Sequence, residues 1–154
     1  AMSQSRRVVA VVLTWHGKVG LFKRSRVMRS DPGKWHCITG FIDGPEVPIG
    51  AAVRELFEET GLGVAELVSF VEGDPLRLPD DEGNLWAVHT FHASTEQRRL
   101  RLNWEHESFR WVPPSRLGRF EGRVEWLDDV LRCLDLAARR ASATLPPALT
   151  ALTP

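Results

Sequence analysis

GFIDGPEVPIGAAVRELFEETGL, the stretch from residue 40 to residue 62, decides the fold of this 154-residue chain. From Pro48 onward its apolar residues recur at the spacing of a helix, on one face formed by Ile49, Ala52, Val53, Leu56 and Phe57. Proline suits the first position of a helix, and a glycine such as Gly61 suits the cap that ends one. We therefore expect an amphipathic helix that begins at Pro48 and ends at Gly61.

Three carboxylates lie on one side of this expected helix. At about 100° per residue, Glu55, Glu58 and Glu59 fall within an arc of roughly 100°. Like charges one turn apart repel each other, and a divalent cation would offset that repulsion. Carboxylate oxygens suit Mg²⁺ or Mn²⁺. A solvated acidic face is the alternative interpretation, and the commoner one for an isolated ExxEE.

The full spacing of the stretch resembles the signature of the Nudix hydrolase family. The matching residues are Gly40, Glu46, Arg54-Glu55-Leu56, Glu58-Glu59 and Gly61-Leu62. The resemblance implies that Glu55, Glu58 and Glu59 are metal ligands, joined by the carbonyl of Gly40. It implies that Arg54, with Glu46, orients those ligands, and that the cofactor is Mg²⁺ or Mn²⁺. The implied reaction is cleavage of a phosphoanhydride bond in a nucleoside diphosphate-linked compound or a related triphosphate.

The rest of the chain predicts strands on both sides of this helix. β-Branched and apolar runs indicate strands at residues 7–15, 18–24, 35–38, 64–71, 85–93 and 109–112, with an acidic loop at 74–84 and a second amphipathic helix at 124–140. An α/β fold follows, a Nudix-like α/β/α sandwich with a mixed β-sheet. We expect one domain over residues 7–140, after a tag remnant and lead-in at 1–6 and before a Pro-rich tail at 141–154.

Hydrolysis also needs a group that accepts a proton from water. The segment NWEHESFRWV resembles a later Nudix pattern in which an acidic residue precedes a Trp-Val strand. Glu105, six residues before Trp111, is our candidate for the base or for a further metal ligand; His106 and Glu107 are the alternatives. Together with the residues of the motif, this gives the candidate catalytic set Glu55, Glu58, Glu59, Arg54 and Glu105.

Arginine and tryptophan residues near the motif are candidates for substrate binding. Arg24 and Arg29 precede it and are expected to contact phosphate, with solvated loop arginines as the alternative. Trp35 and Trp104 are expected to stack on a base or a pterin ring, with core packing as the alternative.

Several specificities and two other functions stay open. The spacing of Arg24, Arg29 and Gly33 resembles coenzyme A diphosphatases, whereas Thr39 before Gly40 resembles dihydroneopterin triphosphate diphosphatases. Cys37 lies near the place of the reactive cysteine in Nudix-fold isopentenyl diphosphate isomerases, although those have a degraded motif. A nucleotide-sensing Nudix domain without turnover is the remaining alternative.

Composition limits the partners. Lys+Arg and Asp+Glu number 20 each, so no overall positive field favours nucleic acid, and the two cysteines do not make a disulfide framework. No apolar run approaches the roughly 20 residues of a membrane span. We expect a cytoplasmic protein that binds a small nucleotide or diphosphate and neither nucleic acid nor membrane. A homodimer is a further option for its assembly.

Overall fold

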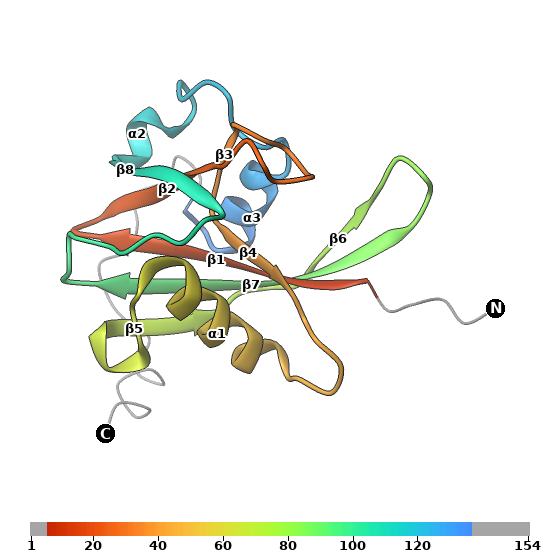
Figure 1. Cartoon of the computed structure of the whole chain (residues 1–154), viewed down its shortest axis with the longest axis horizontal. Coiled ribbons are helices and arrows are strands. Elements are labelled where there is room, and N and C mark those ends of the chain that lie inside the picture. Colours follow the sequence, from red (N-terminus) through yellow and green to blue (C-terminus); the bar gives the residue numbers. More distant parts are fainter. Residues whose placement is uncertain (1–5, 137–154) are drawn as a thin grey trace.

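A single mixed sheet forms the centre of the molecule, which the computed structural model describes from residue 6 to residue 136 (Figure 1). Its main strand order is β3-β2-β1-β7-β5; β4 pairs with β1, β6 with β7 and β8 with β2. β1 and β7 run parallel, and every other pairing is antiparallel. The strands are β1 (Arg7–Trp15), β2 (Lys18–Arg24), β3 (Trp35–His36), β4 (Ile38–Phe41), β5 (Leu67–Glu72), β6 (Leu76–Pro79), β7 (Leu85–Thr95) and β8 (His106–Val112).

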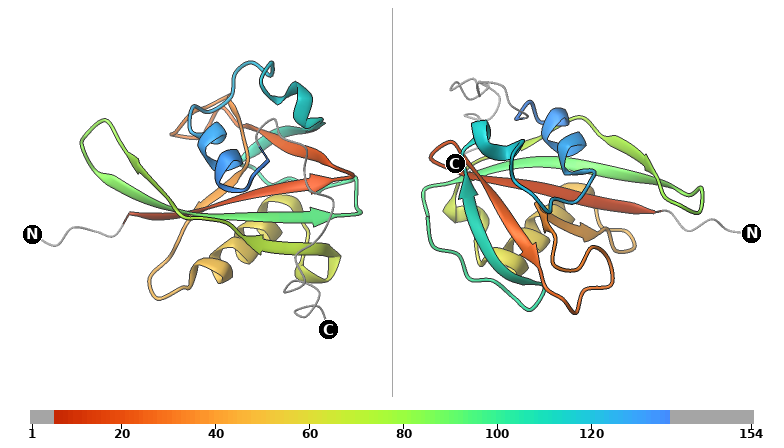
Figure 2. Two further views of the ribbon diagram at one scale, coloured as in Figure 1. Left: turned by 180° about the vertical axis from the view of Figure 1, so that it is seen from behind. Right: turned by 90° about the horizontal axis from the view of Figure 1, so that it is seen from above.

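Helices cover both faces of the sheet (Figures 1 and 2). Alternate residues of a strand point to opposite faces, so β1 contributes Val9, Val11 and Leu13 to the core under α1 (Pro48–Thr60). Ala10 and Val12 belong to the core on the other face, under α3 (Leu127–Cys133). The predicted α/β/α sandwich with a mixed sheet is confirmed. No helix within residues 6–136 is long and apolar enough to cross a membrane.

The predicted central helix is confirmed at both ends. Pro48 is its first residue. Gly61 follows its last, with a φ of 78° that favours glycine, and the Gly61 N–H donates to the Phe57 carbonyl at 2.9 Å. The sequence therefore determines both boundaries of α1.

The predicted loop at 74–84 was wrong, because part of it is a strand. β6 forms a hairpin with β7, in which Leu76 and Leu78 pack against the core while Arg77 is exposed. Asp80 holds the connecting turn: its side chain accepts hydrogen bonds from the Asn84 N–H and the Trp86 indole. The alternation of apolar and polar residues was present, but the prolines and acidic residues around it indicated a loop.

The predicted helix at 124–140 was also too long. Val124 donates its N–H to the Trp35 carbonyl, and Arg123 forms a β-bridge with Trp35, so this segment is held extended beside β3 before α3 begins. Residues 137–140 lie outside the described residues, as do the tail at 141–154 and nearly all of the lead-in.

Smaller differences concern the other elements. The strand predicted at 35–38 is two strands separated by Cys37, and a 3₁₀ turn (η1, Val64–Glu66) precedes β5. β8 begins at His106 rather than Phe109, and a short helix α2 (Pro114–Leu117), not predicted, follows it.

Candidate metal centre

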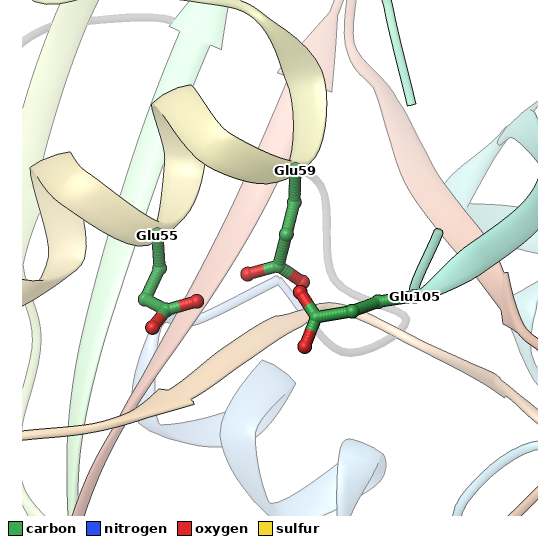
Figure 3. A group of neighbouring side chains, drawn as sticks. All are labelled: Glu55, Glu59 and Glu105. Atoms are coloured by element: carbon green, nitrogen blue, oxygen red, sulfur yellow. The ribbon is translucent and has the colours of Figure 1, made fainter. Parts of the chain in front are cut away.

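Three carboxylates from two separate segments converge on one point (Figure 3). Glu55 and Glu59 lie one turn apart on α1, and Glu105 directly precedes β8. One oxygen of each lies within 4.8 Å of the others. Asn103 holds Glu105 in place, because its side chain accepts from the Glu105 N–H at 3.1 Å and donates to the Glu105 carboxylate at 3.2 Å.

Glu55 and Glu59 are buried in this cluster, Glu105 is half-buried, and Glu59 has the weakest compensation for its burial. Glu59 is 2% exposed and Glu55 8%, and the Glu59 Oε2 atom has no hydrogen-bond partner among the described residues. Burial raises the pKa of Glu59, and the nearby carboxylates of Glu55 and Glu105 raise it further. A buried, unpartnered carboxylate oxygen is unfavourable by itself. A hard divalent cation is the group that this donor set fits.

The backbone of β4 approaches the cluster closely at Gly40. A Cβ atom added there would collide with Cγ, Cδ and Oε1 of Glu55. The glycine therefore leaves the room that the Glu55 side chain occupies.

Arg54, in the middle of α1, ties this helix to the loop before it. Its guanidinium donates to both oxygens of Glu46, at 2.8 and 2.9 Å, and to Glu55 Oε1 at 2.8 Å. It also donates to the Phe41 carbonyl at 3.1 Å. The hydrogen bonds from Arg54 and from the Asp43 N–H lower the pKa of Glu46 to about 2. A bidentate, charge-assisted contact to Glu46 thus holds the guanidinium in place, and a single charge-assisted hydrogen bond from it orients the Glu55 carboxylate.

The family comparison agrees with this geometry. A family model described as NUDIX domain matches residues 4–132. The chain belongs to the Nudix family. Its Nudix motif is the loop from Gly40, the helix α1 and the Gly61-Leu62 cap.

Known relatives match the Nudix domain over part of their own length. The chain is 38% identical over 101 residues to an octanoyltransferase from Myxococcus xanthus, covering 60% of this chain and 27% of that protein. It is 32% identical over 83 residues to Nudix hydrolase 25 from Arabidopsis thaliana, covering 52% of this chain and 41% of that protein. The chain thus spans less than half of either curated relative.

Solved structures share the fold. The dihydroneopterin triphosphate pyrophosphohydrolase of E. coli superposes with a TM-score of 0.70 at 16% identity, over 88% of this chain and 99% of that chain.

One of the three predicted metal-ligand glutamates of α1 lies outside the cluster. The Glu58 side chain is 49% exposed, and its carboxylate lies 3.6 Å from the Arg54 guanidinium. We expected the cluster to consist of Glu55, Glu58 and Glu59. Among the described residues its third member is Glu105 and not Glu58. All three glutamates do lie on one side of α1, but other segments cover only Glu55 and Glu59 and leave Glu58 exposed.

The two alternatives to Glu105 have different surroundings. His106 is buried, and its Nδ1 lies 3.6 Å from Glu59 Oε1. Burial, with the positive charge of Arg24, lowers the pKa of His106 to about 4. Glu107 is exposed and lies 3.7 Å from Lys23.

The candidate substrate residues are dispersed. Arg24 is buried, and its guanidinium donates to the carbonyl and hydroxyl of Ser30 at 2.9 and 2.8 Å. Arg29 is exposed. Trp35 packs edge-on against Phe120 at 5.1 Å, and Trp104 is 68% exposed.

Sequence reasoning missed the role of Asn103 and the buried contact of His106 with Glu59. The only signal for Asn103 is its position two residues before Glu105, which suits a side chain that bonds the local backbone.

Proposed function

We propose that this chain is a divalent-metal-dependent hydrolase that cleaves a phosphoanhydride bond in a nucleoside diphosphate-linked compound or a related triphosphate. The observation that carries the proposal is the convergence of Glu55 and Glu59 of the Nudix motif with Glu105, with an unpartnered Glu59 oxygen among the described residues. Membership of the Nudix family supports the reaction class.

Glu55, Glu59 and Glu105 would hold Mg²⁺ or Mn²⁺, with the Gly40 carbonyl and the exposed Glu58 as further proposed ligands. When bound, the cation supplies positive charge that neutralises phosphate oxygens and makes water easier to deprotonate. Arg54 orients the Glu55 carboxylate and favours its ionised form, against the burial that raises the pKa of Glu55.

Glu105 is our proposed base. It accepts a proton from the water that attacks phosphorus, and the bond between that phosphorus and the bridging oxygen breaks as the other phosphate leaves. Asn103 holds the Glu105 carboxylate toward the cluster. We propose Arg24, Arg29, Trp35 and Trp104 as substrate contacts; the exposure of Arg29 and Trp104 leaves both accessible to a ligand.

The choice of substrate is the finer part of the proposal. Coenzyme A and dihydroneopterin triphosphate are the specific alternatives, from the spacing around Arg24 and from Thr39. The isomerase alternative has no support from Cys37, which is fully buried and whose pKa is raised by that burial.

A substrate panel with metal titration tests the proposal. Nucleoside diphosphate sugars, dinucleoside polyphosphates, nucleoside triphosphates, coenzyme A and dihydroneopterin triphosphate are incubated with Mg²⁺ or Mn²⁺, and the phosphorylated products are separated and measured by anion-exchange chromatography. We expect Glu59→Gln to lower kcat by about 10³ or more. Glu72→Gln, an exposed carboxylate at the end of β5, is the matched control and should keep wild-type activity.

Binding of Mn²⁺, followed by electron paramagnetic resonance, separates the metal site from turnover. We expect Glu59→Gln to weaken binding at least tenfold. Undiminished turnover in EDTA would refute the metal-dependent mechanism. Binding of Mn²⁺ and nucleotide without hydrolysis of any compound would instead favour the sensing domain.

A further inference from the structure

A basic cavity lies at the end of the sheet where β1 turns into β2. Its volume is about 550 Å³, and its lining residues are Trp15, Lys18, Arg98, Arg99, Phe109, Arg110 and Trp111. Figure 1 shows β8 beside β2, with the segment from β7 to β8 passing the same end of β1. None of the seven residues is acidic, although the whole chain has no net charge.

Aromatic rings form the base of this cavity. The Trp15 and Trp111 ring centroids are 5.7 Å apart, and Phe109 meets Trp111 edge-on at 5.8 Å. A Cβ on Gly20 would come within 3.0 Å of Trp111 Cζ3, so the ring lies close against the backbone of β2. The Trp111 indole N–H donates to the Arg98 carbonyl at 3.0 Å, which fixes the ring relative to the segment after β7.

Positive charges surround these rings. Lys18 Nζ lies 5.6 Å from the Trp15 ring centroid and Arg98 Cζ lies 5.9 Å from it. Neither side chain, nor that of the exposed Arg99, forms an ion pair within residues 6–136. The Glu96 carboxylate lies 2.9 Å from His16 Nε2 and forms no ion pair with Lys18, Arg98 or Arg99.

The cavity is separate from the candidate metal centre. Glu105 precedes β8, whereas Trp111 is near the end of that strand, and six residues of strand span about 20 Å. Arg110 also lines the cavity, but its guanidinium lies over the Trp35 ring, 5.6 Å from the centroid. The positive side chains available to a ligand in the cavity are therefore Lys18, Arg98 and Arg99.

We propose that this cavity is a second, non-catalytic binding site for a nucleoside polyphosphate. The His16 ring stacks on Trp15 at 4.3 Å, so the Arg98 guanidinium, which lies over the Trp15 ring, is the plane on which a base stacks. Unpaired lysine and arginine side chains bind phosphate oxygens. The cavity volume is within the range of about 300–1,000 Å³ that small-molecule sites occupy. The inference does not depend on the proposed hydrolysis, because binding here needs no metal.

The test measures ATP binding in EDTA by isothermal titration calorimetry. We expect the exposed double variant Lys18→Gln/Arg98→Gln to raise the Kd for ATP at least tenfold, and Trp15→Leu to raise it severalfold. Arg116→Gln/Arg119→Gln, which removes two exposed arginines elsewhere, is the matched control and should change the Kd less than twofold. Glu59→Gln should also change it less than twofold.

Adenosine and inorganic triphosphate test the two halves of the ligand, and each should bind at least tenfold more weakly than ATP. Triphosphate that binds as tightly as ATP would overturn the nucleotide assignment. An unchanged Kd in Lys18→Gln/Arg98→Gln, or the absence of saturable ATP binding to the wild-type chain, would overturn the site. Loss of binding in Glu59→Gln alone would place ATP at the metal centre and overturn the proposal as well.

Discussion

His36 on β3 predicts how the stability of the fold changes with pH. The side chain is 2% exposed, and neither ring nitrogen has a hydrogen-bond partner among the described residues. The ring packs edge-on against Trp126 at 4.4 Å. Burial, together with the positive charges of Arg24 and His106, lowers the pKa of His36 to about 3.

The sign follows from proton linkage. Below its ordinary pKa of 6.5 the unfolded chain binds a proton at His36 that the folded chain does not bind. The stability that neutral His36 contributes to the fold is therefore fully present above pH 6.5, and it is lost as the pH falls toward 3. Between pH 7.5 and pH 4.5 this single group removes about 2.6 kcal/mol from the free energy of unfolding.

Urea denaturation of the wild-type chain and of His36→Leu, at pH values between 7.5 and 4.5, measures this effect. The variant loses packing against Trp126 and is less stable at pH 7.5, but its stability should fall by about 2.6 kcal/mol less on acidification. Titrating groups that do not interact with His36 contribute equally to both proteins and cancel in the difference. A constant difference between the two proteins across this range would refute the reasoning, as would an NMR titration of the folded His36 ring near pH 6.5.

Three further predictions concern the metal centre. Gly40→Ala should raise the Mg²⁺ concentration for half-maximal activity at least tenfold, because the new Cβ collides with the Glu55 carboxylate; an unchanged metal-activation curve would contradict this. Arg54→Lys cannot keep both Glu46 hydrogen bonds and the one to Glu55, so kcat should fall about tenfold and the pKa of Glu46, followed by NMR, should rise from about 2. Glu105→Gln should lower kcat by about 10²–10⁴, with a normal Mg²⁺ requirement if the residue is only a base and a raised one if it is a ligand; near-normal kcat at every metal concentration would exclude both roles.

The sequence predicted the elements whose signals are local. The start of α1 at Pro48 and its end at Gly61 depend on backbone restrictions of single residues. β1 is apolar from Val8 to Leu13, which is typical of a strand covered on both faces. β6 was missed because its pairing with β7, not its composition, makes it a strand. The start of α3 was misplaced because residues 123 and 124 pair with Trp35, far away in the sequence.

The sequence also did not predict which carboxylates of the metal centre are buried. Helical geometry brings Glu55, Glu58 and Glu59 to one side of α1, but it does not say which of them other segments cover. Glu105 was predicted as a candidate from its distance to Trp111, and the structure places its carboxylate beside those of Glu55 and Glu59. Whether it acts as a base or as a ligand stays a prediction.

The division among the helix glutamates follows from two neighbouring rows of α1. Residues 51, 55 and 59 form one i, i+4 row, and Ala51, Glu55 and Glu59 are all buried in it. The side chains of Arg54 and Glu58 form the adjacent row and face solvent more than those of Glu55 and Glu59 do. Because alanine is small, the first row lies close to the sheet, and the next residue along it, Glu55, meets the backbone of β4 where only a glycine leaves room. The boundary between a buried and an exposed carboxylate is therefore set by the strand beneath the helix, which the helical pattern alone does not describe.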